Sequence, residues 1–229
     1  DAEVSARGYG YRHGRGWGGS SKGAPVDQDG NPVVHGQPDS WSTSESDGER
    51  WRWAMAQVIV FAPDRRSATE LNWAQFLQSQ FGVGTAEAGG PPVIRVAQSD
   101  DAESTPKTSG LWAAHELTDT ETIAKLTKGV KRFALPDEYN PIVIAKAVIG
   151  RKDGIQRNAL ELLISERMSR HQYPQAAELL RDVLKLASAG DDRNSVQARI
   201  DQIVKNWLQF AEATMQPAGK GATIEYRYR

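Results

Sequence analysis

The chain has 229 residues, of which 39% are hydrophobic, so it is long enough for one or two domains with a real core. Its 28 basic and 29 acidic side chains leave a net charge of −1, which excludes an overall field that would steer it to nucleic acid or to an anionic membrane. It has no cysteine, which excludes disulfides, thiolate catalysis, zinc–thiolate sites and iron–sulfur clusters. The longest apolar run, residues 53–62, is too short to cross a bilayer.

Residues 1–48 are predicted to form an extended, low-complexity arm. Between Gly8 and Gly19, glycine alternates with aromatic and basic side chains, and ordering so many glycines is expensive in backbone entropy. We therefore expect the arm to become ordered only against a partner or against the rest of the chain. Residues 27–32 have the composition of a turn, and residues 33–34 are a candidate short strand.

Two helices are predicted next, each from a capping signature followed by an apolar stripe. Ser46 with Glu49 three residues later matches a capping box ahead of a run rich in apolar residues. Ser67 and Glu70 repeat this signature ahead of a helical stripe that closes near Gly82.

A long polar loop follows these helices. Residues 83–114 are rich in Gly, Pro, Ser and Asp, and they contain one apolar run, residues 93–96, that is a candidate strand. We therefore expect residues 49–114 to form small helical segments with a long polar loop.

Further helix signals follow this loop. Thr118 with Glu121 makes a third capping box, ahead of apolar residues between 123 and 130, and predicts a helix there. Asn140 followed by proline predicts an N-cap with proline at the first helical position, and Gly150 is suited to end that helix.

From residue 155 to about residue 215 the pattern is helical almost throughout, with breaks at 171–172 and 189–192. Its first two helices resemble one tetratricopeptide repeat, with Tyr173 as the aromatic beside the turn and Ala176 as the small residue where the helices approach. We therefore expect a repeat-like helical bundle over residues 115–215.

The match to the tetratricopeptide pattern is partial. Arg167 stands where the repeat has an aromatic residue, His171 replaces a glycine and Ser188 replaces a proline. Only one unit is visible, and such a unit needs neighbours to bury its face, so a generic αα-hairpin is the alternative. The helix from Asn194 is expected to stack on the hairpin with Trp207 in the core.

Residues 216–229 change period. Ile224, Tyr226 and Tyr228 alternate with polar side chains, which is typical of a half-buried strand. Such a strand needs a partner, and we expect this segment to be a linker and strand leading to a β domain outside this sequence or in another chain.

A second resemblance covers most of residues 30–229. It is carried by the segments GERWRW at 48–53, DTETIA at 119–124, RFALPDEYN at 132–140 and QPAGKGATI at 216–224. Together they resemble the helical region that precedes the β-sandwich domains of some large bacterial alpha-2-macroglobulin-like proteins. The resemblance implies a periplasmic or extracellular parent protein associated with the cell envelope. The reactive thioester of that family needs a cysteine, which this chain lacks, so protease trapping is not carried over to these residues.

No pattern in the sequence predicts a catalytic, cofactor-binding or metal-binding residue. The four histidines, at 13, 35, 115 and 171, are widely separated and lack the spacing of a metal site. Acidic clusters at 100–103 and 191–192 lie in polar sequence, where solvation or a helix N-terminus explains them. Phosphate-binding loops and nucleophile elbows are absent from the sequence.

The candidate partner-binding residues are aromatic and basic side chains of the arm and of the first helix: Tyr9, Tyr11, Arg12, Trp17, Trp51 and Trp53. Trp51 and Trp53 are two residues apart and point to different faces of a helix, so at most one enters a single core. The arm could instead stack on RNA bases, but it has few arginines and acidic flanks; plain disorder is the third alternative. We expect a mainly α, non-catalytic region that contacts other protein chains or the remainder of its own chain.

Overall fold

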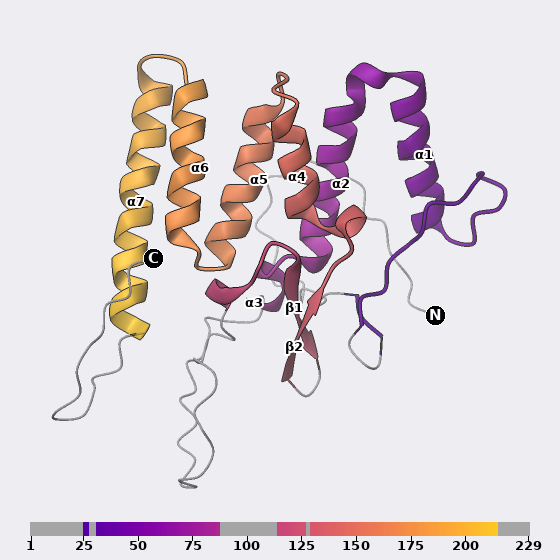
Figure 1. The fold of residues 1–229 in the computed structure, drawn as a ribbon, viewed down its shortest axis with the longest axis horizontal. Helices are drawn as coiled ribbons and strands as arrows, with labels where there is room; N and C mark the ends of the chain where they lie inside the picture. Colours follow the sequence, from indigo (N-terminus) through magenta and orange to yellow (C-terminus); the bar gives the residue numbers. More distant parts are fainter. Residues whose placement is uncertain (1–24, 28–30, 88–113, 127–128, 215–229) are drawn as a thin grey trace, which may run out of the picture.

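The computed structural model describes residues 25–27, 31–87, 114–126 and 129–214, and within them the chain is mainly helical, as predicted. The long helices stand side by side in one row, in chain order, and a β-hairpin lies below the middle of the row, at the lower end of the central helices in this view (Figure 1). The elements are α1 (Asp47–Phe61), α2 (Arg66–Phe81), α3 (Gly84–Glu87), β1 (Glu121–Leu126), β2 (Gly129–Ala134), α4 (Pro141–Gly150), α5 (Gln156–Ser169), α6 (Tyr173–Leu186) and α7 (Asp191–Thr214).

The predicted cap of α1 is confirmed. Ser46 Oγ accepts a hydrogen bond from the backbone N–H of Glu49 (3.2 Å), which satisfies one free donor of the first turn. The Glu49 carboxylate accepts in return from the backbone N–H of Glu45 (2.6 Å), one residue earlier than in a standard capping box. Before this helix, the expected strand at 33–34 is not formed, and a single antiparallel bridge joins Val26 to Pro32 just ahead of it.

The helix predicted after Ser67 is present, but its cap is not the one predicted. The helix α2 already begins at Arg66, and no side chain caps it. Ser67 is buried within the first turn, where its Oγ accepts from Arg151 (3.1 Å). Glu70 binds Arg66 and Arg151 instead of the helix N-terminus. Gly82 ends the helix, as predicted.

The helix predicted after Thr118 is wrong, because residues 121–134 form the antiparallel hairpin β1–β2. The local contact itself exists: the Glu121 carboxylate accepts from the Thr118 backbone N–H (2.9 Å) and hydroxyl (2.7 Å). The β-branched residues that follow form a strand instead of a helix, and their side chains are buried. Ile123 is buried, and Thr122 donates its hydroxyl proton to the carbonyl of Phe81 (2.5 Å).

The start of α4 follows the sequence closely. Asn140 Oδ1 accepts from the backbone N–H groups of Ile142 (2.9 Å) and Val143 (3.3 Å), and Pro141 occupies the first turn. Asn140 also donates to the carbonyl of Asp119 (2.8 Å), so the cap joins α4 to the turn before β1. The helix ends at Gly150, as predicted.

The apolar core is divided along the row into separate clusters. One lies between α5, α6 and α7, a second joins α2, α4 and α5, and a third packs α2 against residues 133–139. The breaks between α5, α6 and α7 fall where predicted, and Ala176 is fully buried in the α5–α6 hairpin. Trp207 does not lie in the core as expected, because 38% of its surface is exposed.

Candidate interaction surface

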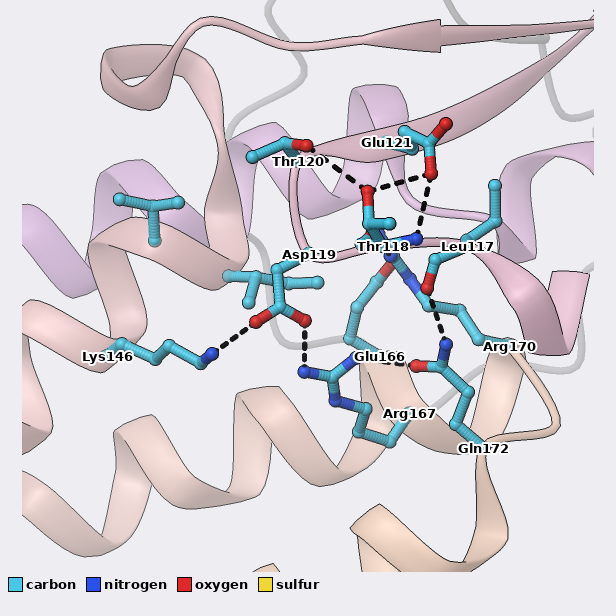
Figure 2. Close-up of polar contacts among 12 residues, drawn as sticks. Leu117, Thr118, Asp119, Thr120, Glu121, Lys146, Glu166, Arg167, Arg170 and Gln172 are labelled. Carbon is cyan, nitrogen blue, oxygen red and sulfur yellow. Dashed lines mark hydrogen bonds and ion pairs between the residues drawn. The ribbon is translucent and has the colours of Figure 1, made fainter. Parts of the chain in front are cut away.

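A group of interconnected polar side chains lies where the turn before β1 meets α4 and α5 (Figure 2). Asp119 binds both Lys146 of α4 and Arg167 of α5. Burial raises the pKa of the Asp119 carboxyl, but the hydrogen bonds from Lys146 and Arg167 outweigh burial and hold this pKa below its usual value. Asp119 is therefore a charged bridge between two helices.

A buried ion pair stands beside this bridge. Glu166 of α5 and Arg170, the residue that follows the last turn of α5, are both only 2% exposed, and their side chains meet at 2.9 Å. Gln78 of α2 donates to the Glu166 carboxylate (3.2 Å), and Arg170 donates to the carbonyl of Thr118 (2.9 Å). The pair thus joins α2, α5 and the turn before β1.

These contacts make the polar group a clasp between elements. Gln172 donates to the carbonyl of Leu117 (2.8 Å), and Arg167 donates to Gln172 (2.5 Å). An acid–base pair in catalysis needs environments that move two pKa values apart, whereas the pKa values of Asp119 and Glu121 are both lowered by cationic partners. The arrangement suits anchoring of the segment 114–121 on the α5–α6 turn.

The clasp also explains why the α5–α6 hairpin departs from the tetratricopeptide pattern. Arg167 takes the place of an aromatic residue because its guanidinium reaches Asp119 and Gln172. His171 takes the place of a glycine in a backbone conformation with φ of 56°, and its ring stacks on Phe210 of α7 (5.0 Å between centroids). Sequence reasoning missed the clasp, although charged residues on the buried stripe of α5 were a visible signal for it.

The histidines of the described residues serve aromatic and polar packing. His115 and His171 both contact Phe210, and His35 shares a hydrogen bond with Ser46 (3.3 Å). Within the described ranges, no cluster of three or more His, Cys, Asp or Glu side chains is placed to hold a metal ion.

The helix α1 carries the two predicted contact residues that the structure describes. Trp51 lies against the rings of Trp73 (5.4 Å) and Phe76 (4.8 Å) of α2. Trp53 meets Trp41 of the preceding loop edge to face (6.1 Å). The two tryptophans therefore pack on different partners and do not form one patch.

The first half of α1 is held to the row more closely than its second half. The Arg52 guanidinium lies over the rings of Trp73 (4.2 Å) and Tyr139 (5.2 Å). Towards the end of the helix, Val58, Val60 and Phe61 are 41%, 65% and 81% exposed. No side chain of α1 is buried, although residues 54–61 carry no charge.

An apolar groove runs between α1 and α2. Its α1 wall is formed by Trp51, Met55 and Val58, and the remaining lining residues are Arg65, Ala68, Thr69 and Asn72. A helix that is apolar on all sides is normally buried. The groove and the free end of α1 together define a candidate interaction surface, the α1 surface.

The opposite end of the row also has an apolar outer face. On α7, Val204, Trp207 and Leu208 are 43%, 38% and 56% exposed. One and two turns earlier, the same side of the helix carries the polar residues Asp201 and Gln197. The apolar patch, here the α7 patch, is therefore confined to the last turns of α7.

The remaining predicted contact residues, Tyr9, Tyr11, Arg12 and Trp17, lie outside the described residues. The predicted strands at 93–96 and 222–229 lie outside them as well. No helix in the described part combines the length and apolarity that a membrane span requires.

The chain matches no protein-family model, no curated protein and no solved structure. Fold and surface are therefore the basis of any functional assignment.

Proposed function

We propose that this chain is a non-catalytic protein–protein interaction or spacer region of a larger protein. The observation that carries the proposal is the apolar outer face of both terminal helices, Val60 and Phe61 on α1 and Leu208 on α7. In Figure 1 these helices stand at opposite ends of the row.

A stack of helices depends on neighbour-to-neighbour packing, and it normally ends in helices whose outer face is polar. Here each interior helix packs on the helices before and after it, and the stack ends in apolar faces on both sides. This pattern favours an internal section whose ends are covered by other polypeptide. The charged clasp at Asp119 and Glu166 would keep the section rigid.

The resemblance to the helical region of large bacterial alpha-2-macroglobulin-like proteins supports the same proposal. It implies a parent protein in the cell envelope or outside the cell, with this section ahead of β-sandwich domains. The balanced charge of the chain suits contacts with protein rather than with nucleic acid.

The test is photo-cross-linking in cells that produce the protein. A photoreactive phenylalanine derivative is placed at Val60 or at Leu208, and cross-linked peptides are identified by mass spectrometry. We expect each position to cross-link to a defined protein segment, either of the same long chain or of another chain. The control position is Asp182 on α6, whose side chain is 51% exposed. Absence of cross-links at Val60 and Leu208, or the same products at Asp182, would contradict the proposal.

A further inference from the structure

The described part of the chain begins against the helices that form the groove between α1 and α2. Pro25 and Val26 line an apolar cavity together with Phe76 of α2. Phe76 in turn lies against Trp51 (4.8 Å between ring centroids), and Trp51 belongs to the α1 wall of the groove. The residues before Pro25 are therefore attached close to one end of the groove.

The groove has the size and chemistry of a site for side chains. Its volume is about 250 Å³, below the range of about 300–1,000 Å³ that is typical of small-molecule pockets. Its α1 wall is apolar, and Trp51 and Val58 in this wall are 38% and 41% exposed. Between them, the flexible side chain of Met55 can adapt to a neighbour, and the ring of Trp51 can pack on another ring. A large aromatic side chain suits this wall.

The sequence before Pro25 supplies such a side chain at a suitable distance. Trp17 is the nearest aromatic residue on that side, eight positions before Pro25, and the residues between them are GGSSKGA. A Gly/Ser-rich chain of this length has a root-mean-square span of about 16 Å. The α1 wall from Trp51 to Val58 is about 10 Å long, because each helical residue rises about 1.5 Å. Trp17 can therefore reach the groove on a tether that is not much longer than the groove itself.

We propose that the N-terminal arm binds in the groove of its own chain, with Trp17 against Trp51, Met55 and Val58. The inference rests on the proposed function, because it names the polypeptide that covers the groove of the α1 surface. Val60 and Phe61 do not line the groove, so the end of α1 stays available to a further protein segment.

The attachment of the arm favours it over an unrelated partner. A tethered segment meets its site at an effective concentration on the order of mM and avoids most of the loss of free motion that a separate chain undergoes on binding. Gly16 and Gly18 on either side of Trp17 have no side chain, so the backbone can approach the groove walls closely. On the wall formed by α2, Asn72 is exposed, and its amide can both donate to and accept from that backbone.

The test is disulfide formation in the full chain, which has no cysteine of its own. One cysteine is placed beside Trp17 (Gly18→Cys) and the second in the groove (Asn72→Cys). In the control pair the second cysteine is instead at Val60, which is 65% exposed and does not line the groove. We expect the groove pair to close an intrachain disulfide at least about tenfold faster than the control pair, because docking raises the effective concentration.

Substitutions in the groove pair identify the contact. Trp17→Ala should slow the groove pair to the rate of the control pair, whereas Ser20→Ala, a truncation within the tether, should leave its rate unchanged. Val58→Glu places a charge in the groove and should also slow the reaction, whereas Val60→Glu places the same charge outside it and should not. Far-UV circular dichroism checks that each variant keeps its helices.

Equal rates for the two cysteine pairs, or an unchanged rate in the Trp17 variant, would overturn the proposal. Disulfides that join two chains instead of closing one would overturn it as well, because the arm would then bind a second copy. Photo-cross-linking of Val60 and Leu208 to a defined protein segment would in each case leave the proposed function standing without the arm in the groove.

Discussion

The pair Glu166–Arg170 is the most deeply buried ion pair among the described residues. It stabilises the fold only while both charges are present. Removing one member leaves the other charge in the core without compensation, which typically costs about 3–5 kcal/mol of unfolding free energy. Glu166→Leu should therefore be strongly destabilising in urea unfolding. The double variant Glu166→Leu/Arg170→Met removes both charges and should recover part of this loss, although the Thr118 carbonyl then loses its donor. A double variant that loses the sum of the two single changes would show that the charges do not act as a pair.

A second carboxylate, Glu121, makes part of the stability dependent on pH. Hydrogen bonds from Arg132 (2.6 Å) and from Thr118 lower the pKa of Glu121 from 4.5 to about 2. A carboxyl with a lowered pKa in the folded state stabilises the fold above its unfolded pKa, and this contribution disappears as the pH falls from 4.5 towards 2.

Glu121→Gln should therefore reduce the unfolding free energy at neutral pH by about 1 kcal/mol, the upper range for a partly exposed ion pair. Over the acidic window the difference from the wild-type chain should shrink towards zero. Urea unfolding at about pH 6 and about pH 3 measures it. A difference that stays constant with pH would show that the Glu121 carboxylate is not the titrating group.

At the scale of single elements, the sequence is informative where a helical stripe is long or a cap is local. The positions of α1, α2, α5, α6 and α7 follow from apolar residues repeating every three or four positions. The start of α4 follows from Asn140 and Pro141, whose side chains act on the turn beside them. These features depend on residues that are close in sequence, so a single sequence is sufficient to predict them.

The hairpin shows where local patterns stop being sufficient. Thr118 and Glu121 make the same carboxylate-to-backbone contact that starts a helix, and yet β1 follows. Contacts outside this local pattern stabilise the strand: Ile123 is buried with Val83 and Leu117, and Arg132 donates a hydrogen bond to Glu121. Such pairings, like the hydrogen bond from Thr122 to Phe81 across 41 positions, leave no periodic signal in the sequence.

The candidate surface was predictable only in part for the same reason. The exposure of Trp51 beside the groove follows from its helical position, because Trp51 and Trp53 cannot enter the same core. The clasp was not predictable, because Gln78, Asp119, Lys146 and Glu166 come from four separate segments.

At the scale of the whole molecule, the row of helices consists of packing clusters that share few residues. Leu180 belongs to the cluster of α5, α6 and α7, while Ile142 belongs to the cluster of α2, α4 and α5. Ile149 and Leu179 pack against both clusters and are the apolar link between them. In such a stack, stability is approximately a sum of local terms and nearest-neighbour contacts.

This arrangement predicts that damage to one cluster spreads only to its neighbours. Leu180→Ala and Ile142→Ala each empty a fully buried site and should cost about 2–5 kcal/mol locally. The measurement is hydrogen exchange followed by mass spectrometry. Leu180→Ala should accelerate exchange in α6 and α7, while α2 keeps its protection. Ile142→Ala should accelerate exchange in α2 and α4, while α7 keeps its protection. The two variants serve as controls for each other because the same kind of cavity is placed at different points of one row. Equal acceleration of exchange from α2 to α7 in either variant would contradict this prediction. It would show that Ile149, Leu179 and the clasp at Asp119 and Glu166 join the clusters into one cooperative unit.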